Sequence, residues 1–358
     1  MFFTGQLYSI DSNVRLPFLP SRLPFIEHEP GQVFSQNLYN RPEVLSTNEG
    51  PPADDDSYLG YSVAVGDFAD DGEAGVAVGM PRGAGLLGKI VLYSWNLTNL
   101  QNITGEQLGA YFGYSLCVVD VDGDELDDLI IGAPLYTDLT NNEGHYENGR
   151  VYVVYQGRET YKFRDLHTRD GKNSKSRFGL ALTSLGDINK DGFGDFAVGA
   201  PYDGQFERGA VYIYHGSRNG VREKASQVIF AENVLLPGHA TTFGFSLSGG
   251  LDLDNNQYPD LIIGAYEADS AFFLRARPVV KMQSSLQFIS ESKQISLEDR
   301  TCSLKDTTEV SCLQLSTCLE YSGIGVDKNL DFDVQLLLDS KKPKVPECSS
   351  YQRKERMS

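Results

Sequence analysis

One pattern of apolar and polar positions recurs three times along this chain. Each copy opens with a short apolar run, continues through a loop rich in Asp, and closes with a second apolar run that ends in Gly-Ala. In the clearest copy these runs are residues 113–119 and 129–133, and residues 151–155 form a further run. Short apolar runs bounded by turn residues are typical of β-strands. The pattern therefore predicts an all-β chain.

The spacing of the copies predicts the blades of a β-propeller. The glycines of the opening motif, including that of a degraded first copy, follow one another at intervals of 53, 66 and 65 residues: Gly60, Gly113, Gly179 and Gly244. Repeat units of about 60 residues with roughly four short strands are typical of propeller blades. An array of β-sandwiches is the alternative. The recurring Gly-Ala favours blades, because small residues let the inner strands crowd around an axis.

The remaining apolar runs predict the outer strand of each blade. These outer strands are expected at residues 89–95, 151–155, 210–214 and 271–274. The repeats differ in length, and we place the differences in the connecting segments 136–149, 158–176 and 218–241.

The repeats divide the chain into expected domains. Residues 31–277 should form a partial propeller of about four blades, in which residues 31–35 are a strand-like piece with no loop of its own. Residues 1–30 are rich in Pro and form a non-repeat N-terminal segment. Four blades are too few to close the propeller that we expect, so its first part should be missing from this chain.

A different pattern begins after the last repeat. Apolar and polar residues alternate in residues 284–289 and 330–338, which predicts half-buried strands. Residues 278–340 should therefore be the start of an incomplete β-sandwich. The polar, basic tail at residues 341–358 is expected to be disordered.

Charge and hydropathy exclude some partners. The formal net charge of −18 argues against nucleic acid. No run of 18 apolar residues occurs, so we expect no membrane segment. The first residues lack a basic region and a sustained apolar core, so they do not resemble a signal peptide.

The Asp-rich loops predict cation sites. Each carries an oxygen-bearing side chain at its positions 1, 3, 5 and 9 and can add the backbone carbonyl of position 7. Calcium takes about six to eight oxygen ligands. Zinc would require Cys or His, and magnesium prefers a smaller site that keeps its waters. The predicted Ca²⁺ ligands are Asp120, Asp122, Asp124, Leu126 and Asp128; Asp187, Asn189, Asp191, Phe193 and Asp195; and Asp252, Asp254, Asn256, Tyr258 and Asp260.

The loops do not match an EF-hand, and they differ in quality. They lack the bidentate Glu that an EF-hand requires. The middle loop has Gly192 at its position 6, where a sharp turn is needed, whereas Glu125 and Gln257 are less suited to that place. Asn256 removes one charge from the third site. A preference of Asp and Asn for turns is the alternative, and three matching copies favour the ion.

A fourth copy has lost part of the donor set. It begins at Asp67, and its positions 3 and 9 are Ala69 and Gly75. We expect the same turn there without a strong ion.

Sequons and cysteines indicate an extracellular setting. Asn96 and Asn102 begin Asn-x-Thr sequons for glycosylation. Cys302, Cys312 and Cys318 cluster, with Cys348 beyond, which is typical of a disulfide-bearing segment. Cys302 with Cys312 is the preferred pair because it closes a short loop. The pairing cannot be deduced from the sequence, and reduced thiols remain the alternative. The lone Cys117 should be a buried small hydrophobe.

The sequence offers no catalytic constellation. Its histidines are scattered without the spacing of metal ligands, and no Gly-x-Ser-x-Gly elbow is present: His28, His145, His167, His215 and His239. We therefore do not expect an enzyme.

Several longer motifs make the chain resemble an integrin α subunit, of the insect PS2 type or the vertebrate αV type. They lie, in the order and spacing of that family, at residues 55–68, 104–108, 111–115, 200–202 and 275–279. In that family seven such units, called FG-GAP repeats, form a propeller, and a thigh β-sandwich with a Cys pair near its start follows. Cys302 and Cys312 stand where that pair would be.

The resemblance implies a function in adhesion at the cell surface. An integrin β subunit would be the partner, and an extracellular matrix protein the ligand, with possible recognition of Arg-Gly-Asp. The calcium loops would stiffen the blades on the face away from the ligand. Asp55, with Asp56 beside it, stands where an acidic residue pairs with the ligand arginine; a solvated acidic turn is the alternative.

The chain also departs from the family. Its first blades and most of its thigh, leg, membrane and cytoplasmic parts are absent, so we expect a truncated chain. A secreted or non-functional fragment, or an FG-GAP module of an extracellular hydrolase, are the alternative functions.

Overall fold

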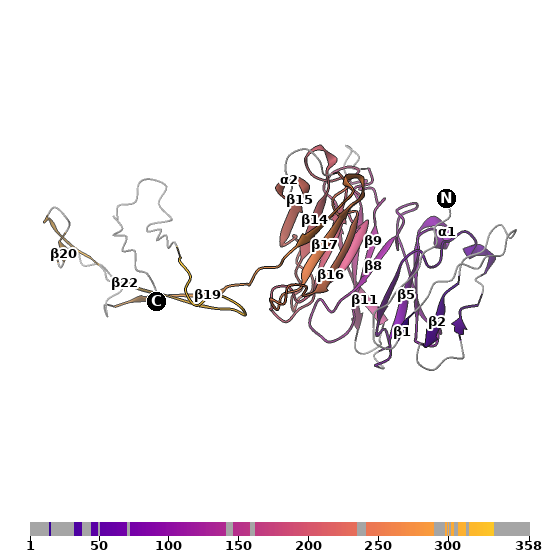
Figure 1. Cartoon of the computed structure of the whole chain (residues 1–358), viewed down its shortest axis with the longest axis horizontal. Helices are drawn as coiled ribbons and strands as arrows, with labels where there is room; N and C mark the ends of the chain where they lie inside the picture. Colours follow the sequence, from indigo (N-terminus) through magenta and orange to yellow (C-terminus); the bar gives the residue numbers. More distant parts are fainter. Residues whose placement is uncertain are drawn as a thin grey trace. The chain divides into compact units, whose positions relative to one another are not determined.

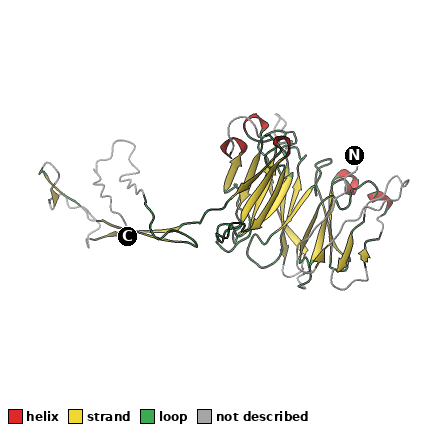
Figure 2. Ribbon diagram, in the orientation of Figure 1, coloured by secondary structure: helices red, strands yellow, loops and turns green. Residues whose placement is uncertain are grey.

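The computed structural model confirms the all-β class (Figure 2). It divides into two units, Met1–Arg277 and Pro278–Ser358, which are described separately. The described residues are 14–15, 32–37, 44–48, 51–69, 72–140, 146–157, 162–234, 241–289, 298, 300, 302–303, 307–312 and 315–332.

Three four-stranded antiparallel sheets form the centre of the first unit, and each strand pairs with the next in chain order. One sheet contains β4 (Val63–Gly66), β5 (Gly75–Met80), β6 (Lys89–Tyr93) and β7 (Asn99–Thr104). The next contains β8 (Ser115–Val118), β9 (Leu129–Ala133), β10 (Arg150–Gly157) and β11 (Lys162–Asp170). The third contains β12 (Ala181–Gly186), β13 (Asp195–Ala200), β14 (Ala210–Tyr214) and β15 (Gln227–Phe230).

A three-stranded sheet stands at each side of this group. The last sheet contains β16 (Ser246–Leu251), β17 (Asp260–Ala265) and β18 (Ser270–Leu274). The first contains β1 (Val14–Arg15), β2 (Phe34–Asn37) and β3 (Val44–Ser46). The strand-like piece expected at residues 31–35 thus begins at Phe34 within the described residues. Its partner β1 comes from the segment that showed no repeat.

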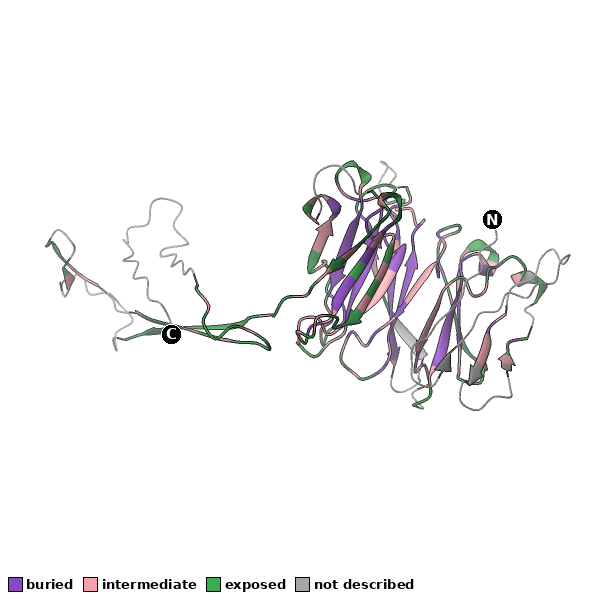
Figure 3. Cartoon of the chain, viewed as in Figure 1, coloured by how far each residue is buried: buried purple, intermediate pink, exposed green. Residues whose placement is uncertain are grey.

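Apolar clusters lie between successive sheets. The inner strands β4, β8, β12 and β16 contact one another in that order, and Figure 1 shows the sheets side by side. The second strands are almost wholly buried, as the purple strands of Figure 3 show. One cluster joins Ile130 and Val151 to Phe196 and Val198 of the following sheet. Each sheet therefore buries apolar residues on neighbouring sheets, as propeller blades do.

The Gly-Ala that ends each repeat marks a close contact between blades. A Cβ at Gly132 would lie 2.1 Å from the carbonyl oxygen of Gly179 in the next blade. Ser115 Oγ donates to the same oxygen over 2.7 Å, and Ser62 Oγ repeats the bond to Gly113 one blade earlier. A side chain at Gly132 would force the inner strands apart. The small residue is thus required by packing.

The prediction that the third runs are outer strands was wrong for three blades. β6, β10 and β14 lie inside a fourth strand, and β11 and β15 fall within the segments 158–176 and 218–241, which we had treated as connections. β7 and β11 are mostly polar, whereas β15 contains an apolar run of only three half-buried residues. Their weak apolar signal reflects their place at the edge.

Short helical segments connect some strands. They are η1 (Pro52–Asp54), α1 (Gly83–Leu86), η2 (Gln205–Glu207), α2 (Ala231–Val234) and η3 (Tyr266–Ala268). Among the described residues, no helix is long and apolar enough to cross a membrane.

The second unit contains two small sheets. β19 (Lys281–Phe288) pairs with β22 (Leu315–Ser322), and β20 (Cys302–Ser303) pairs with β21 (Glu309–Val310). The prediction of a half-buried strand at residues 284–289 was wrong in its burial, because β19 is exposed along its whole length with β22 as its strand partner. Residues 330–332 form no strand, and residues 333–338 and the tail 341–358 lie outside the described residues.

Candidate functional site

Each predicted cation loop joins the first and second strands of a blade. We name residues 120–128 loop 1, residues 187–195 loop 2 and residues 252–260 loop 3; they connect β8 to β9, β12 to β13 and β16 to β17. The ends of the blades that carry these loops are called the loop end. Because the strands are antiparallel, the segments that precede each first strand lie at the opposite end.

The first Asp of each loop holds the loop closed. Asp120 accepts hydrogen bonds from the backbone N–H of Gly123 at 2.7 Å and of Glu125 at 2.9 Å. In loop 2, Asp187 accepts hydrogen bonds from the backbone N–H groups of positions 5 and 6, at 3.0 and 2.8 Å. In loop 3, Asp252 accepts the same two hydrogen bonds, at 3.1 and 2.7 Å. The bond from position 6 to position 1 is common to the three loops. It fixes one curl in three different sequences.

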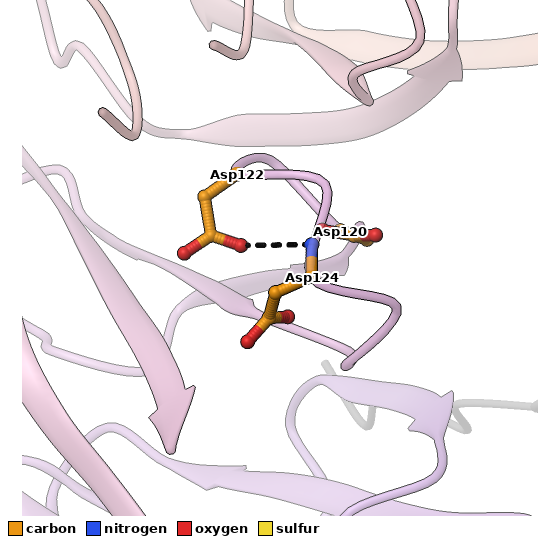
Figure 4. Close-up of side chains that lie close together, drawn as sticks. All are labelled: Asp120, Asp122 and Asp124. Carbon is orange, nitrogen blue, oxygen red and sulfur yellow. Dashed lines mark hydrogen bonds between the residues drawn. The ribbon is translucent and has the colours of Figure 1, made fainter. Parts of the chain in front are cut away.

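The side chains at positions 3 and 5 form a matching ladder. Asp122 Oδ1 accepts the N–H of Asp124 at 3.3 Å, the bond drawn in Figure 4. The equivalent acceptors, Asn189 and Asp254, lie 2.9 and 3.1 Å from the N–H of position 5. Position 5 accepts in turn from the N–H of position 7 at 3.0, 3.2 and 2.8 Å in loops 1, 2 and 3. The predicted donor oxygens are therefore held in the same way in each loop.

The turn at position 6 does not depend on glycine. Glu125 and Gln257 adopt left-handed backbone angles, with φ of 69° and 74°, and Gly192 has φ of 95°. The expectation that Glu125 and Gln257 would suit the turn less well is corrected in this respect: their backbone takes the same left-handed turn. The hydrogen bonds to the first Asp hold it there.

The Asp at position 9 ties each loop to its blade. Asp128, Asp195 and Asp260 are buried. One carboxylate oxygen of each Asp accepts a hydrogen bond from the backbone N–H of position 2 in its own loop. The other oxygen accepts a hydrogen bond from the backbone N–H of a residue at or just after the end of the third strand of the blade. These residues are Gln156, Gly216 and Ala276, at 3.0, 3.0 and 2.9 Å. Sequence reasoning gave these residues only as ligands and missed this structural contact.

The electrostatics of the loops favour a cation. One carboxylate oxygen from each of Asp120, Asp122 and Asp124 lies within 4.8 Å of the other two (Figure 4), and the same holds for Asp252, Asp254 and Asp260. Burial, together with the charges of Asp124 and Asp120, raises the pKa of Asp122 to about 6. Burial raises the pKa of Asp128 to about 8 and that of Asp195 to about 7, although the hydrogen bonds that these carboxylates accept from backbone N–H groups act to lower both pKa values. A divalent cation would offset burial and repulsion together, so the residues fit such an ion.

The degraded loop at Asp67 keeps the turn without the full donor set. Asp67 accepts the N–H of Ala69 and of Gly72, the latter over 2.8 Å. Its ninth residue is Gly75, where a Cβ would lie 2.5 Å from the carbonyl oxygen of Tyr93. The expected turn is therefore present, and the space for a ninth ligand is closed.

The acidic turn predicted as the ligand site lies at the opposite end of the blades. Asp54 pairs with Lys89 Nζ at 3.1 Å, and both side chains are largely buried. Asp55 and Asp56 are exposed, and Asp56 has φ of 57°. Arg82 donates to the hydroxyl of Tyr58 at 2.9 Å beside this turn. Lys89 thus offsets one of the three charges of this turn.

Exposed aromatic side chains also lie at that end, and they were not singled out from the sequence. Tyr58 and Tyr61 are 46% and 45% exposed, and Phe206 and Tyr266 are 74% and 52% exposed. All stand in segments that precede a first strand or join a second strand to a third. The signal was available, because Tyr58 and Tyr61 flank the Gly of an opening motif.

The remaining predicted sites are placed as follows. Asn96 and Asn102 are exposed, in the β6–β7 turn and on β7. Cys302 and Cys312 are joined by a disulfide, and Cys318 is exposed on β22. Cys117 is buried in β8, as predicted, and burial raises the pKa of its thiol to about 12.

Comparison with known proteins identifies both units. The FG-GAP repeat family matches residues 112–154 and 178–214, and the family of integrin alpha Ig-like domain 1 matches residues 276–349. These ranges contain loops 1 and 2 in the first unit and β19 to β22 in the second.

Among curated proteins the chain is similar to several integrin α chains. It is 52% identical to Integrin alpha-PS2 of Drosophila melanogaster over 95% of this chain and 25% of that protein. It is 42% identical to Integrin alpha-V of Gallus gallus and 41% identical to Integrin alpha-5 of Xenopus laevis, each over 84% of this chain. The chain spans 29% and 28% of those two proteins, so it corresponds to about a quarter of these relatives.

Proposed function

Because the chain belongs to the integrin α family, we propose that it supplies part of the α side of an adhesion receptor at the cell surface. In this proposal the blades bind calcium at the loop end. The opposite end faces an integrin β subunit and a matrix ligand. Residues 278–340 begin the sandwich that follows the blades.

One observation carries this proposal: the acidic turn and the cation loops lie at opposite ends of neighbouring inner strands. β4 begins after the turn that holds Asp55, and it ends at the degraded loop that starts with Asp67. β8, which lies beside β4, ends at loop 1. Ion binding can therefore stiffen the blades without occupying the surface that meets a ligand.

Calcium would be held by side-chain oxygens at positions 1, 3, 5 and 9 of each loop and by the carbonyl of position 7. The donors are all oxygens, the set that calcium prefers over zinc. When bound, the ion supplies charge compensation for clustered carboxylates. The chain's own residues supply the closed loop, since the hydrogen-bond ladder holds these side chains.

The ligand arginine would be recognised at the acidic turn. A guanidinium pairs well with a carboxylate through two parallel hydrogen bonds. Asp54 is engaged by Lys89, whereas Asp55 and Asp56 are exposed. We assign the pairing to Asp55, with Asp56 adding negative charge beside it.

The exposed rings at the same end suit a protein partner. Aromatic residues and Arg are enriched at the buried centres of protein interfaces. Tyr58, Tyr61, Phe206 and Tyr266 supply such rings, and Arg82 stacks on Tyr58 at 4.9 Å from the ring centre. We assign this surface to the β subunit. The hydrolase-module alternative is not retained, because the integrin α chains are not enzymes.

Co-expression with an integrin β subunit tests the proposal. The full chain should be recovered with the β subunit, and the pair should be captured by an immobilised Arg-Gly-Asp peptide. Asp55→Asn should weaken capture about thirtyfold or more, since removing one partner of a charged pair costs about 2 kcal/mol or more. Recovery of the β subunit should be unchanged.

The matched control is Glu223→Gln, which removes one exposed charge from the loop end, in the segment between β14 and β15. It should leave capture unchanged. Equal capture by Asp55→Asn and the parent chain would refute the assignment of Asp55, and failure to recover the β subunit would refute the receptor proposal for this chain.

A further inference from the structure

Neighbouring cation loops are in direct contact with one another. The contact between loops 1 and 2 is made by the backbone: Gly194 N–H, at position 8 of loop 2, donates to the carbonyl oxygen of Asp120 over 2.8 Å. A Cβ at Gly194 would lie 2.4 Å from that oxygen, so the two chains approach as closely as glycine permits. Position 8 of loop 2 therefore packs directly against the first residue of loop 1.

Two further contacts join loop 1 to the blade that carries loop 2. A Cβ built on Gly123 would lie 2.8 Å from the ring of Phe193, so this ring at position 7 of loop 2 rests on position 4 of loop 1. Ser217 N–H, which follows β14, donates to the carbonyl oxygen of Val121 over 3.0 Å. Positions 1, 2 and 4 of loop 1 are thus held by the blade that carries loop 2.

The contact between loops 2 and 3 is weaker because it lacks the backbone hydrogen bond at position 8. Position 8 of loop 3 is Pro259, which has no N–H to donate. Position 7 is again a ring, Tyr258, and it meets the ammonium group of Lys190 at 5.6 Å from the ring centre. A lysine side chain is flexible and transmits little of the backbone geometry around it. Loop 1 is therefore held by two backbone hydrogen bonds and by a ring that rests directly on glycine, whereas loop 2 meets loop 3 through the side chains of Lys190 and Tyr258.

We propose that loops 1 and 2 bind calcium cooperatively, whereas loops 2 and 3 bind it almost independently. The inference rests on the proposed function, in which the loops hold calcium. Asp120 contributes a ligand to loop 1, and its carbonyl anchors Gly194. Gly194 in turn stands between Phe193 and Asp195, two ligands of loop 2. An ion that orders either loop fixes the anchor of the other, and such coupling is reciprocal.

Variants of the full chain that each retain two loops separate the two contacts. Asp252→Ala/Asp254→Ala removes loop 3 and keeps loops 1 and 2, and Asp120→Ala/Asp124→Ala removes loop 1 and keeps loops 2 and 3. Calcium is titrated into each by calorimetry after removal of bound metal. In the first variant the second ion should bind about fivefold more tightly than the first, after statistical correction, a modest allosteric coupling. In the second variant the second ion should bind no more tightly than the first after the same correction.

A third variant provides an internal reference. Asp187→Ala/Asp191→Ala keeps loops 1 and 3, which do not belong to neighbouring blades, and their ions should bind independently. Cooperativity as strong here as in the variant with loops 1 and 2 would overturn the proposal, because it would not arise from the Gly194 contact. Equal stepwise affinities in the variant with loops 1 and 2 would also overturn it.

A single side chain tests the contact without touching a ligand atom. Phe193→Ala retains the backbone carbonyl at position 7 and removes the ring from Gly123. Introduced into the variant with loops 1 and 2, it should reduce the coupling by about half or more. The matched control Phe206→Ala, at the opposite end, should leave it unchanged. Absence of calcium uptake in the parent chain would refute the proposed function itself, whereas uptake at independent sites would refute only the coupling.

Discussion

At the scale of single residues, a hydrogen bond to the Asp at position 1 holds the backbone conformation of position 6 in each loop. Glu125, Gly192 and Gln257 all have positive φ, and each donates its N–H to the first Asp of its loop. A left-handed backbone costs a residue with a side chain about 1–2 kcal/mol. The loop bears this strain in two of three cases, so the hydrogen bond fixes the turn more strongly than the choice of residue does.

Gly192→Ala should therefore lower the free energy of unfolding by about 1 kcal/mol, since its φ of 95° suits glycine best. The change is measured by denaturant unfolding in excess calcium. Gln257→Gly is the matched control, because it relieves strain and should change stability by less than about 1 kcal/mol. A Gly192→Ala chain as stable as its parent would show that the turn tolerates any residue.

Residue identity indicated the candidate oxygen donors but not the hydrogen bonds that hold them in place. The alternation of Asp and Asn was visible in the sequence, and the same oxygens lie together in loops 1 and 3. The second contact of Asp128 depends on Gln156, 28 residues away on β10, and no local pattern indicates it. Long-range hydrogen bonds of this kind require the strand pairing to be known first.

At the scale of the element, close contact between inner strands accounts for the repeated Gly-Ala. Gly132 on β9 faces the carbonyl oxygen of Gly179, and Gly199 on β13 faces that of Gly244, each with 2.1 Å to a built Cβ. The Gly within β9 and the Gly before β12 thus meet in one close contact between blades. The blades are held together where these residues are small.

Gly132→Ala should separate two inner strands and lower the free energy of unfolding by about 1–3 kcal/mol, the usual effect of overpacking. Thermal and denaturant unfolding measure this loss. Ser115→Ala is the milder comparison: it removes only the hydrogen bond to Gly179 and should cost about 1 kcal/mol. If Gly132→Ala were the more stable of the two, the packing argument would be contradicted.

Element prediction succeeded where strands are buried and failed at the rim. β9, β13 and β14 are buried along their length and were visible as apolar runs. β7 and β11 are edge strands rich in polar residues, and β15 has an apolar run of only three residues, so the hydrophobic pattern did not separate them from connections. The buried strands of a blade can be predicted from their apolar runs, whereas the fourth strand is recognised only by its pairing with the third.

At the scale of the whole molecule, the account separates stabilisation from recognition. The loop end contains carboxylate clusters whose burial a bound cation would compensate, and the opposite end contains Asp55, Asp56 and exposed rings. The family could be predicted from sequence, because its motifs are local and ordered. The partner and ligand remain proposals, since the chain spans about a quarter of its integrin relatives.

The central claim is that the repeated Asp-rich loops are calcium sites. Its most direct test is the calcium stoichiometry of the full chain, measured by calorimetry, against that of Asp187→Ala/Asp191→Ala. The account predicts one ion for each of the three complete loops in the parent chain and one fewer in the variant. An unchanged stoichiometry would contradict it.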